Sequence, residues 1–472
     1  MKRTLFTLCV GLVTIALYAE NFKIDPSKRL HRHGGWGVSL CWWAGQCGRW
    51  DDEKVDRLVE WITSKEGLNY SVFRYNIPGG DDPENRHCDP HHMAKGKGLR
   101  AEMEGFLTQQ GRNYDWQADA AQRRVMLKLR QARPDAIFEA FSNTPPYFMT
   151  VSGCAAGHDN PARDNLKREC YHAFADYLID VCLHYKKQYG LTFYSLEPFN
   201  EPMTSYWNRN GSQEGCHFDV ASMIEFVKVL SPKLKAAKLK TRLAVTDETS
   251  VKQSVEALSQ FCADLSVLKM VDQWNTHTYS ADEASRKTLR ALATKAKLPL
   301  WMSETGSGGR GIEGNLSLSQ RLLDDVKQMQ PDVWCDWQVM EEHNDQWCTI
   351  QGKFDGSDFR RNKNYYVRRQ VTGFINAGDT FLDAGDDHSL VAISKDKRHL
   401  ILVSQNNTAA DRPYSVDLTS FRRIGTAAKA YLTDIHHDCE AIDPVPIHNQ
   451  TLQYTLRPQS ICTFIIPLKS TK

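Results

Sequence analysis

The sequence has almost no excess charge of either sign, and this lack excludes several classes of protein. Its 472 residues carry 59 Lys and Arg against 57 Asp and Glu, a formal net charge of +2. Binding to nucleic acid or to an acidic membrane surface depends on clustered positive charge, which this balance does not supply. The composition, with 41% hydrophobic and 25% charged residues, also excludes collagen, coiled coils and disordered chains. We expect a globular protein without a nucleic-acid partner.

Long apolar runs are equally scarce. One run, Leu5–Leu17, follows the basic residues Lys2 and Arg3 and precedes Ala19. This pattern is typical of a secretory signal peptide, whereas a span of the bilayer needs a longer run; the alternative is a buried first helix. We expect cleavage after Ala19, no membrane span, and a protein that is secreted or periplasmic.

The sequence also lacks the spacings of familiar metal sites. Cleavage would remove Cys9, one of 13 cysteines, and deliver the others to an oxidising compartment. Cys41 and Cys47 are close enough in sequence to bridge, but spacing alone does not determine a pairing, and theirs does not match a zinc site. The acidic stretch Asp383–Asp387 lacks the spacing of a calcium loop. We expect neither a metal nor a cofactor.

After residue 33, short apolar runs alternate with amphipathic stretches. In Asp51–Ser64 the apolar residues recur at the spacing of one helix face. Strands separated by helices favour a parallel sheet, and eight such units close into a (β/α)8 TIM barrel. The predicted strands are Trp36–Leu40, Tyr70–Tyr75, Ala136–Phe141, Thr192–Pro198, Arg242–Thr246, Val271–Thr276, Pro299–Met302 and Val333–Gln338.

The pattern changes near residue 366, where short alternating strands follow one another without helices. These strands are Leu390–Ser394, His399–Ser404, Ala428–Tyr431, Leu452–Leu456 and Ile461–Ile466. Such spacing predicts an all-β sandwich. We expect a barrel over residues 34–365, a sandwich over 366–472, and an N-terminal strand from residues 20–33 that joins the sandwich.

Two glutamates follow predicted barrel strands, at the end where barrel enzymes place their chemistry. Glu201 comes after the fourth strand and Glu304 after the seventh, so they would face each other across the barrel mouth. Glycoside hydrolysis needs such a pair, one carboxyl group to protonate the leaving oxygen and one to attack or to activate water. Either residue alone could instead form a structural ion pair.

Six motifs in order across the barrel resemble those of glycoside hydrolase family 30, in the clan of retaining barrel glycosidases. They are Gly34–Ala44, Phe73–Asp81, Ser142–Met149, Glu197–Pro202, Trp301–Gly306 and Asp336–Gln338. The resemblance covers essentially the whole mature chain and implies a barrel with a β-sandwich built from both chain ends. Gly35–Ala44, with its paired tryptophans, most resembles the endo-β-1,6-galactanase branch, which cuts side chains of plant arabinogalactan. Activities on β-1,6-glucan, xylan, xylosides, fucosides or glucosylceramide stay open.

The resemblance implies a retaining mechanism with Glu201 as general acid/base and Glu304 as nucleophile. Their carboxyl groups should then lie about 5–5.5 Å apart. We expect Arg74, at the end of the second strand, to lie beside Glu304 and to lower its pKa. Asn200 is expected to hydrogen-bond the sugar 2-OH.

Further residues at strand ends are expected to bind the sugar, because aromatic faces suit sugar rings and hydroxyl groups need paired donors and acceptors. Trp337 is the expected subsite floor, and Trp42 and Trp43 are expected to line the cleft. The residues that match first-subsite positions of the family are Asp81, Tyr147, His277 and Tyr279. The expected partner is a β-linked polysaccharide or oligosaccharide, and no obligate protein partner is evident.

Three other classes of function compete with this one. Gly306–Gly311 matches the G-x-G-x-x-G motif of NAD-dependent oxidoreductases, but it follows the seventh strand and does not open a βαβ unit. A non-catalytic carbohydrate-binding protein would not need both glutamates. A serine esterase of the α/β-hydrolase type is opposed by the lack of G-x-S-x-G.

Overall fold

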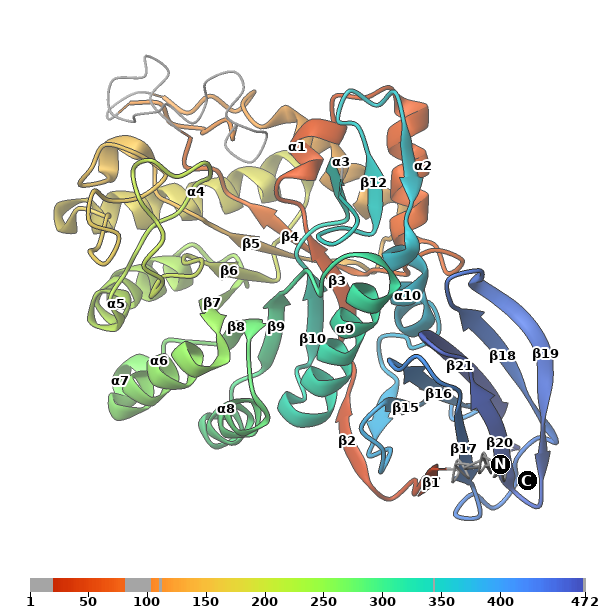
Figure 1. The fold of residues 1–472 in the computed structure, drawn as a ribbon. Helices are drawn as coiled ribbons and strands as arrows, with labels where there is room; N and C mark the ends of the chain where they lie inside the picture. Colours follow the sequence, from red (N-terminus) through yellow and green to blue (C-terminus); the bar gives the residue numbers. More distant parts are fainter. Residues whose placement is uncertain (1–19, 81–102, 110–112, 343, 470–472) are drawn as a thin grey trace, which may run out of the picture.

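The computed structural model describes residues 20–80, 103–109, 113–342 and 344–469 (Figure 1). A closed barrel of eight parallel strands forms its larger part. In barrel order the strands are β10 (Val333–Asp336), β3 (Gly35–Ser39), β4 (Val72–Asn76), β5 (Ile137–Phe141), β6 (Ser195–Glu197), β7 (Arg242–Ser250), β8 (Gln273–Ser280) and β9 (Leu300–Glu304). The predicted (β/α)8 barrel is confirmed.

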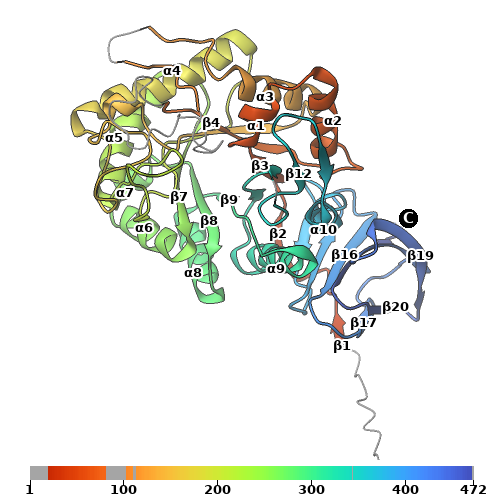
Figure 2. The same ribbon diagram turned by 45° about the horizontal axis from the view of Figure 1, so that its top comes forward.

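Helices surround the barrel strands (Figure 2). They are α1 (Trp43–Cys47), α2 (Asp52–Thr63), α3 (Ala120–Ala132), α4 (Tyr171–Tyr189), α5 (Val220–Ala236), α6 (Val251–Ala263), α7 (Leu265–Leu268), α8 (Glu283–Ala296), α9 (Gly311–Asp324) and α10 (Lys363–Thr372). Helix α2 shows why these segments fold as they do. The Asp51 side chain caps it by accepting from the Lys54 backbone N–H, and its apolar face, which includes Val55 and Ile62, is buried.

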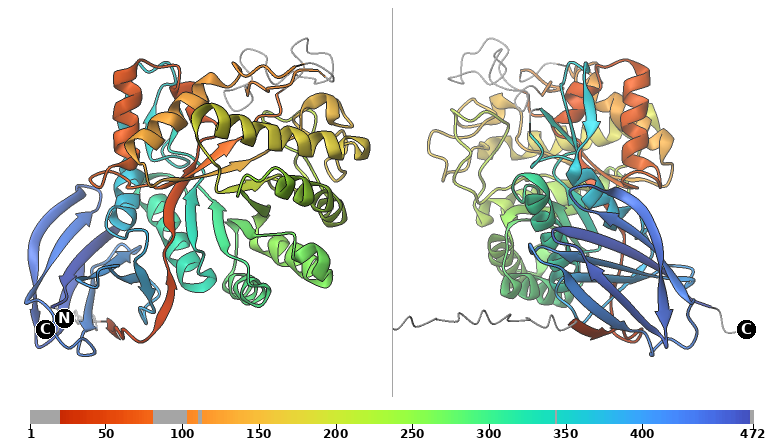
Figure 3. Two further views of the ribbon diagram at one scale, coloured as in Figure 1. Left: turned by 180° about the vertical axis from the view of Figure 1, so that it is seen from behind. Right: turned by 45° about the vertical axis from the view of Figure 1, so that its right-hand side comes forward.

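Both chain ends meet in a second sheet, the sandwich expected beyond the barrel. Its order is β1-β17-β20-β19-β18-β21-β16-β15-β14-β2. The bounds are β1 (Glu20–Lys23), β2 (Arg29–Arg32), β14 (Thr380–Leu382), β15 (Ser389–Ile393), β16 (His399–Asn406), β17 (Arg412–Asp417), β18 (Ala427–Thr433), β19 (Asp438–His448), β20 (Thr451–Leu456) and β21 (Ser460–Pro467). The N-terminal segment thus supplies two strands, one to each edge of this order, and Figure 3 shows it running along the barrel to the sandwich.

Helix α10 joins the two sheets. Tyr365 and Val371 lie in the barrel core, while the Gln370 side chain donates to Thr433 Oγ1 and its carbonyl accepts from Thr463 Oγ1 in the sandwich. The expected boundary between residues 365 and 366 therefore falls inside one helix. A sequence pattern does not show that boundary, because α10 packs against both domains.

A small sheet, which the sequence patterns did not predict, follows the last barrel strand. It consists of β11 (Met340–Glu342), β12 (Ile350–Gly352) and β13 (Phe359–Arg361). Its short strands carry no clear alternation, so the sequence pattern gives no signal for them.

Cys41 and Cys47 are both free and buried, so the bridge that their spacing allowed is not formed. The Cys41 thiol accepts from Asn143 Nδ2, and the Cys47 thiol contacts the Met340 sulfur. Cys154 is disulfide-bonded.

Among the helices of the described ranges, none combines the length and the apolar character that crossing a bilayer requires.

Candidate active site

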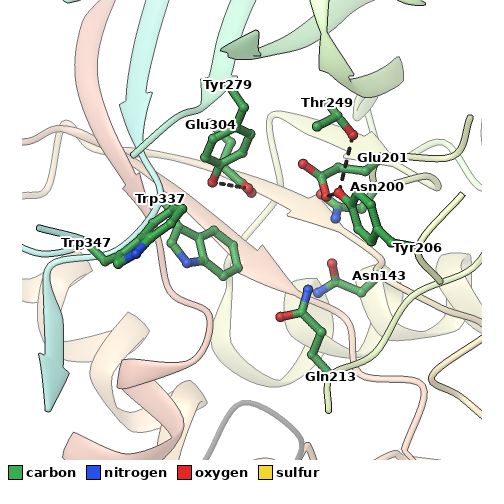
Figure 4. Close-up of a pocket in the computed structure, with 10 residues that line it drawn as sticks. All are labelled: Asn143, Asn200, Glu201, Tyr206, Gln213, Thr249, Tyr279, Glu304, Trp337 and Trp347. Atoms are coloured by element: carbon green, nitrogen blue, oxygen red, sulfur yellow. Dashed lines mark hydrogen bonds between the residues drawn. The ribbon is translucent and has the colours of Figure 1, made fainter. Parts of the chain in front are cut away.

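A pocket of about 220 Å³ opens at the carboxyl ends of the barrel strands (Figure 4). Parallel strands of a closed barrel end at one face, so their last side chains converge there. The residues that line the pocket are Asn143, Asn200, Glu201, Tyr206, Gln213, Thr249, Tyr279, Glu304, Trp337 and Trp347. Both predicted catalytic glutamates are among them.

Glu201 and Glu304 approach each other around one imidazole. His277 Nδ1 lies 3.1 Å from Glu201 Oε1 and 3.6 Å from Glu304 Oε1, and one oxygen of each carboxyl group lies within 4.8 Å of the other. Retaining glycosidases hold their two carboxyl groups about 5–5.5 Å apart, whereas inverting enzymes hold them about 6.5–9.5 Å apart. This close approach of the two carboxyl groups favours a retaining pair over an inverting one.

Local backbone contacts set the position of Glu201. Its φ of 49° lies in the left-handed region, and its N–H donates to the Asp247 carbonyl at 2.8 Å. The Met203 N–H donates to the Glu248 side chain at 3.2 Å. The end of β7 thereby holds the turn that presents Glu201, whereas Glu304 is simply the last residue of β9.

Arg74 lies beneath the pair, fully buried among three carboxylates. Its Nη1 donates to Glu304 Oε2 at 3.2 Å, its Nε donates to Glu139 Oε1 at 2.9 Å, and its Nη2 bonds Asp247. The guanidinium also lies over the Phe141 ring, 4.1 Å from its centroid. Arg74 therefore divides its charge among three carboxylates, and Glu304 receives only a share of it.

Arg74 lies beside Glu304 and lowers its pKa, as expected, but other effects are stronger and the pKa of Glu304 lies above its ordinary value. Burial raises this pKa to about 7; Glu201 and Asp247 add to the rise, while His277 and Arg74 oppose it. The protein interior disfavours the charged form more than the shared guanidinium favours it. This balance depends on three-dimensional burial, which the sequence does not show.

The imidazole of His277 carries a proton at neutral pH. Burial lowers its pKa, but the negative charge of Glu304 and the hydrogen bonds to Asp247 and Glu201 outweigh burial and raise the pKa to about 10. Glu201, His277 and Glu304 bring together ligand-type atoms within 4.8 Å of one another, as do Asp164, His217 and Asp219 elsewhere in the structure.

Hydroxyl and amide groups complete the pocket. The Tyr279 hydroxyl donates to Glu304 Oε1 at 2.9 Å, and the Tyr206 hydroxyl donates to Glu201 Oε2. Asn200 is buried beside Glu201, and its Oδ1 accepts no hydrogen bond from the described residues. A buried acceptor without a donor is costly, so a ligand hydroxyl group would suit it.

The three predicted tryptophans divide between pocket and core. Trp337 lines the pocket, and Trp42 packs edge-on behind it with ring centroids 6.2 Å apart. Trp42 is not among the residues that line this pocket, and its ring supports that of Trp337. Trp43 is completely buried in the barrel core, where its Nε1 donates to the Ser39 carbonyl at 2.8 Å, and the prediction that it lines the cleft is wrong. It begins the short helix α1, which turns its side chain inward.

Tyr147 is not among the residues that line this pocket. Tyr147 is buried, and its hydroxyl donates to the Thr108 carbonyl at 2.7 Å. Asp81 lies outside the described residues.

The glycines of Gly306–Gly311 form the turn from β9 to α9, where a Cβ at Gly306 would lie 3.4 Å or less from Trp347 and Trp337. This motif lets the pocket tryptophans approach the backbone.

Five pocket residues were not predicted from the sequence: Asn143, Tyr206, Gln213, Thr249 and Trp347. Asn143 and Thr249 stand at or beyond the ends of barrel strands, so the strand-end argument could have found them. The other three come from loops, and loop sequences carry no periodic signal that shows which side chains point inward.

Comparisons with known proteins agree with this geometry. The family model O-Glycosyl hydrolase family 30 matches residues 19–309. An endo-beta-1,6-galactanase from Hypocrea rufa is 31% identical over 435 residues, which span 88% of this chain and 88% of that protein. An exo-beta-1,6-galactobiohydrolase from Bifidobacterium longum is 24% identical, and the match spans 84% of this chain but 35% of that longer protein.

Solved structures share the fold. A conserved exported protein from Bacteroides fragilis superposes with a TM-score of 0.78 at 18% identity, covering 94% of this chain and 99% of that one. The catalytic domain of GH30 xylanase C from Talaromyces cellulolyticus gives a TM-score of 0.72 at 16% identity, covering 95% of this chain and 100% of that one. At these identities the likeness concerns the fold alone.

Proposed function

The chain belongs to glycoside hydrolase family 30, and from this premise we propose that it is an endo-β-1,6-galactanase that acts on arabinogalactan side chains. The family makes it a glycoside hydrolase. The observation that carries the mechanism is the approach of the Glu201 and Glu304 oxygens to within 4.8 Å around His277. The linkage is supported by the similarity to the Hypocrea rufa galactanase over 88% of both chains.

In the first step of the proposed reaction, a Glu304 carboxylate oxygen attacks the anomeric carbon. The glycosidic C–O bond breaks as the bond to Glu304 forms, and Glu201 gives its proton to the leaving oxygen. Tyr279 and Arg74 each donate to one Glu304 oxygen and hold the carboxylate in place. These contacts orient the nucleophile before the sugar arrives.

In the second step, water attacks the anomeric carbon, and the bond to Glu304 breaks. Glu201 now takes the proton from water, which restores both residues and retains the β configuration. The unpartnered Asn200 Oδ1 accepts a sugar hydroxyl group, and the rings of Trp337 and Trp347 contact the faces of the sugar. No step requires a metal or a cofactor.

A side-by-side digestion tests the substrate. β-1,6-Galactan and β-1,6-glucan are incubated with the enzyme, the products are sized, and the first anomers are followed by NMR. A ladder of galacto-oligosaccharides with β anomers first is expected. Faster digestion of glucan would overturn the assignment of the sugar, release of galactobiose alone would overturn endo action, and α anomers first would overturn the retaining mechanism.

We also propose that the chain is exported and cleaved after Ala19. The basis is the sequence of residues 1–19, with Lys2 and Arg3 before the apolar run Leu5–Leu17. Mass spectrometry of protein from the medium or periplasm should show an N-terminus at Glu20. An intact N-terminus on a protein that stays in the cytoplasm would overturn this proposal.

A further inference from the structure

Tyr206 belongs both to the catalytic pocket and to the open surface of the molecule. We propose that its hydroxyl positions the acid/base Glu201, and that its exposed ring binds the first sugar on the leaving-group side of the scissile bond. This inference rests on the proposed glycosidase mechanism and deepens it, because it defines which part of the substrate the enzyme must engage beyond the sugar that is attacked.

The exposure of the ring is the first observation. Tyr206 is 46% exposed, and it is the one aromatic residue among the large hydrophobic side chains that stand out from the surface of the described ranges. It also lines the pocket that holds Glu201 and Glu304. An exposed aromatic face at a sugar-cleaving pocket offers a stacking surface for a sugar ring.

The hydroxyl group is the second observation. It donates to Glu201 Oε2 and lies 3.4 Å from Thr249 Oγ1, while the other Glu201 oxygen faces His277. Burial raises the pKa of Tyr206 above its ordinary value, and the negative charge of Glu201 adds to the rise, so the phenol stays protonated as a donor. Tyr206 and His277 together hold both oxygens of the acid/base.

The loop that carries Tyr206 is firmly anchored. The neighbouring Trp207 packs edge-on against the Tyr206 ring, with centroids 4.5 Å apart, and its Nε1 donates to the Glu201 carbonyl at 3.0 Å. A Cβ at Gly215 would lie 2.1 Å from the Trp207 ring, so the indole leaves no room there for a side chain. Further along, Glu214 accepts from the Gly79 backbone N–H at 3.1 Å. These contacts fix the loop, as the proposed role of Tyr206 in positioning Glu201 requires.

The direction of proton transfer determines where the leaving sugar lies. Glu201 delivers its proton to the glycosidic oxygen, so the leaving sugar departs past Glu201 and away from Glu304. Figure 4 shows Tyr206 on the far side of Glu201 from Glu304. As the proton moves to the leaving oxygen and the glycosidic bond breaks, Glu201 becomes a carboxylate, and the Tyr206 hydroxyl donates to it while keeping its own proton. The same contact holds the carboxylate until it takes a proton from water in the second step.

Two substitutions separate the two roles. Tyr206→Phe removes only the hydroxyl, and Tyr206→Ala also removes the ring. Each is measured on a β-1,6-galacto-oligosaccharide and on a dinitrophenyl glycoside, whose leaving group needs no proton. Loss of a hydrogen bond to a charged group lowers a rate constant by a factor of about 10 to 100. Tyr206→Phe should therefore lower kcat/KM on the oligosaccharide by that factor and leave kcat/KM on the dinitrophenyl glycoside nearly unchanged.

Tyr206→Ala should lower kcat/KM on the oligosaccharide by a further factor of about 3 to 10, expressed as a higher KM, since the stacking surface is gone. The matched control is Tyr454→Phe in the sandwich, whose hydroxyl contacts Cys462 and no residue of the pocket. It should behave as the wild type on both substrates. Thermal melts of every variant verify that the fold is intact.

Several results would overturn the inference. An equal loss on both substrates in Tyr206→Phe would mean that the hydroxyl acts on the fold and not on proton transfer. An equal KM for Tyr206→Ala and Tyr206→Phe would mean that the ring binds no sugar. The oligosaccharide is taken from whichever linkage the wild type cleaves. Inactivity of the wild type on galactan therefore overturns the proposed substrate alone, and the role of Tyr206 is still decided.

Discussion

The catalytic carboxylate Glu304 should destabilise the fold at neutral pH, so Glu304→Gln should give a more stable protein. Burial raises the pKa of Glu304 from its ordinary 4.5 to about 7. The folded state therefore holds this proton more tightly than the unfolded chain does. As pH rises from 4.5 to 7, the unfolded chain loses its proton first, and the free energy of unfolding falls across that window.

The magnitude follows from the size of the shift. A rise of about 2.5 pKa units corresponds to about 3 kcal/mol, since each unit is worth about 1.4 kcal/mol. Glutamine is neutral at every pH and has nearly the same shape, so the variant loses none of this stability. We expect Glu304→Gln to exceed the wild type by about 3 kcal/mol at pH 8 and by less than about 1 kcal/mol at pH 5. For a chain of this length, the larger difference corresponds to about 3 °C in Tm.

Denaturant and thermal unfolding at pH 5 and pH 8 provide the assay. Glu66→Gln, at an exposed glutamate of the barrel surface, is the matched control and should change the free energy of unfolding by less than about 0.5 kcal/mol at both values. The reasoning is refuted if Glu304→Gln is less stable than the wild type at pH 8, or if its advantage is the same at pH 5. Either result would mean that the ion pairs with Arg74 and His277 outweigh burial.

Three further predictions concern activity. The kcat/KM should fall below pH 7 as Glu304 becomes protonated, which gives the pH profile an acid limb. His277→Gln should move this acid limb to higher pH, because it removes a positive charge that lowers the pKa of Glu304. A wild-type acid limb below pH 5 would contradict the assignment. Glu201→Ala should lower kcat/KM on galactan by a factor of about 100 to 10,000 but gain rate from azide on a dinitrophenyl glycoside, and a variant that azide does not accelerate would point to another acid. Trp43→Ala should lower the free energy of unfolding by about 3–5 kcal/mol with KM unchanged, whereas a raised KM in a stable variant would return Trp43 to the cleft.

The barrel and its catalytic pair could be predicted because both depend on order along the chain. Each barrel strand is a short apolar run between helical patterns, and the strand-end position singled out Glu201 and Glu304 without any knowledge of side-chain packing. The lengths of β7 and β8 were underestimated. Both strands continue past their predicted ends with polar residues such as Asp247 and His277, which a search for apolar runs misses.

Side-chain direction could not be predicted. Trp42 and Trp43 are adjacent, yet one packs against Trp337 and the other enters the barrel core, because the short helix α1 begins at Trp43. Tyr206 comes from a loop whose shape depends on contacts far along the chain. Contacts of this kind are set by tertiary packing and leave no local periodicity in the sequence.

The two edge strands of the sandwich have a consequence for the order in which the chain folds. Glu20 in β1 aligns with Tyr414 in β17, and the Glu20 side chain bonds Arg412, so the first described residues find their partners almost 400 residues later. Every barrel strand is synthesised before those partners exist. The barrel can therefore fold while the N-terminal segment is still unpaired. The sandwich folds last, because β1 can pair only after β17 has been synthesised.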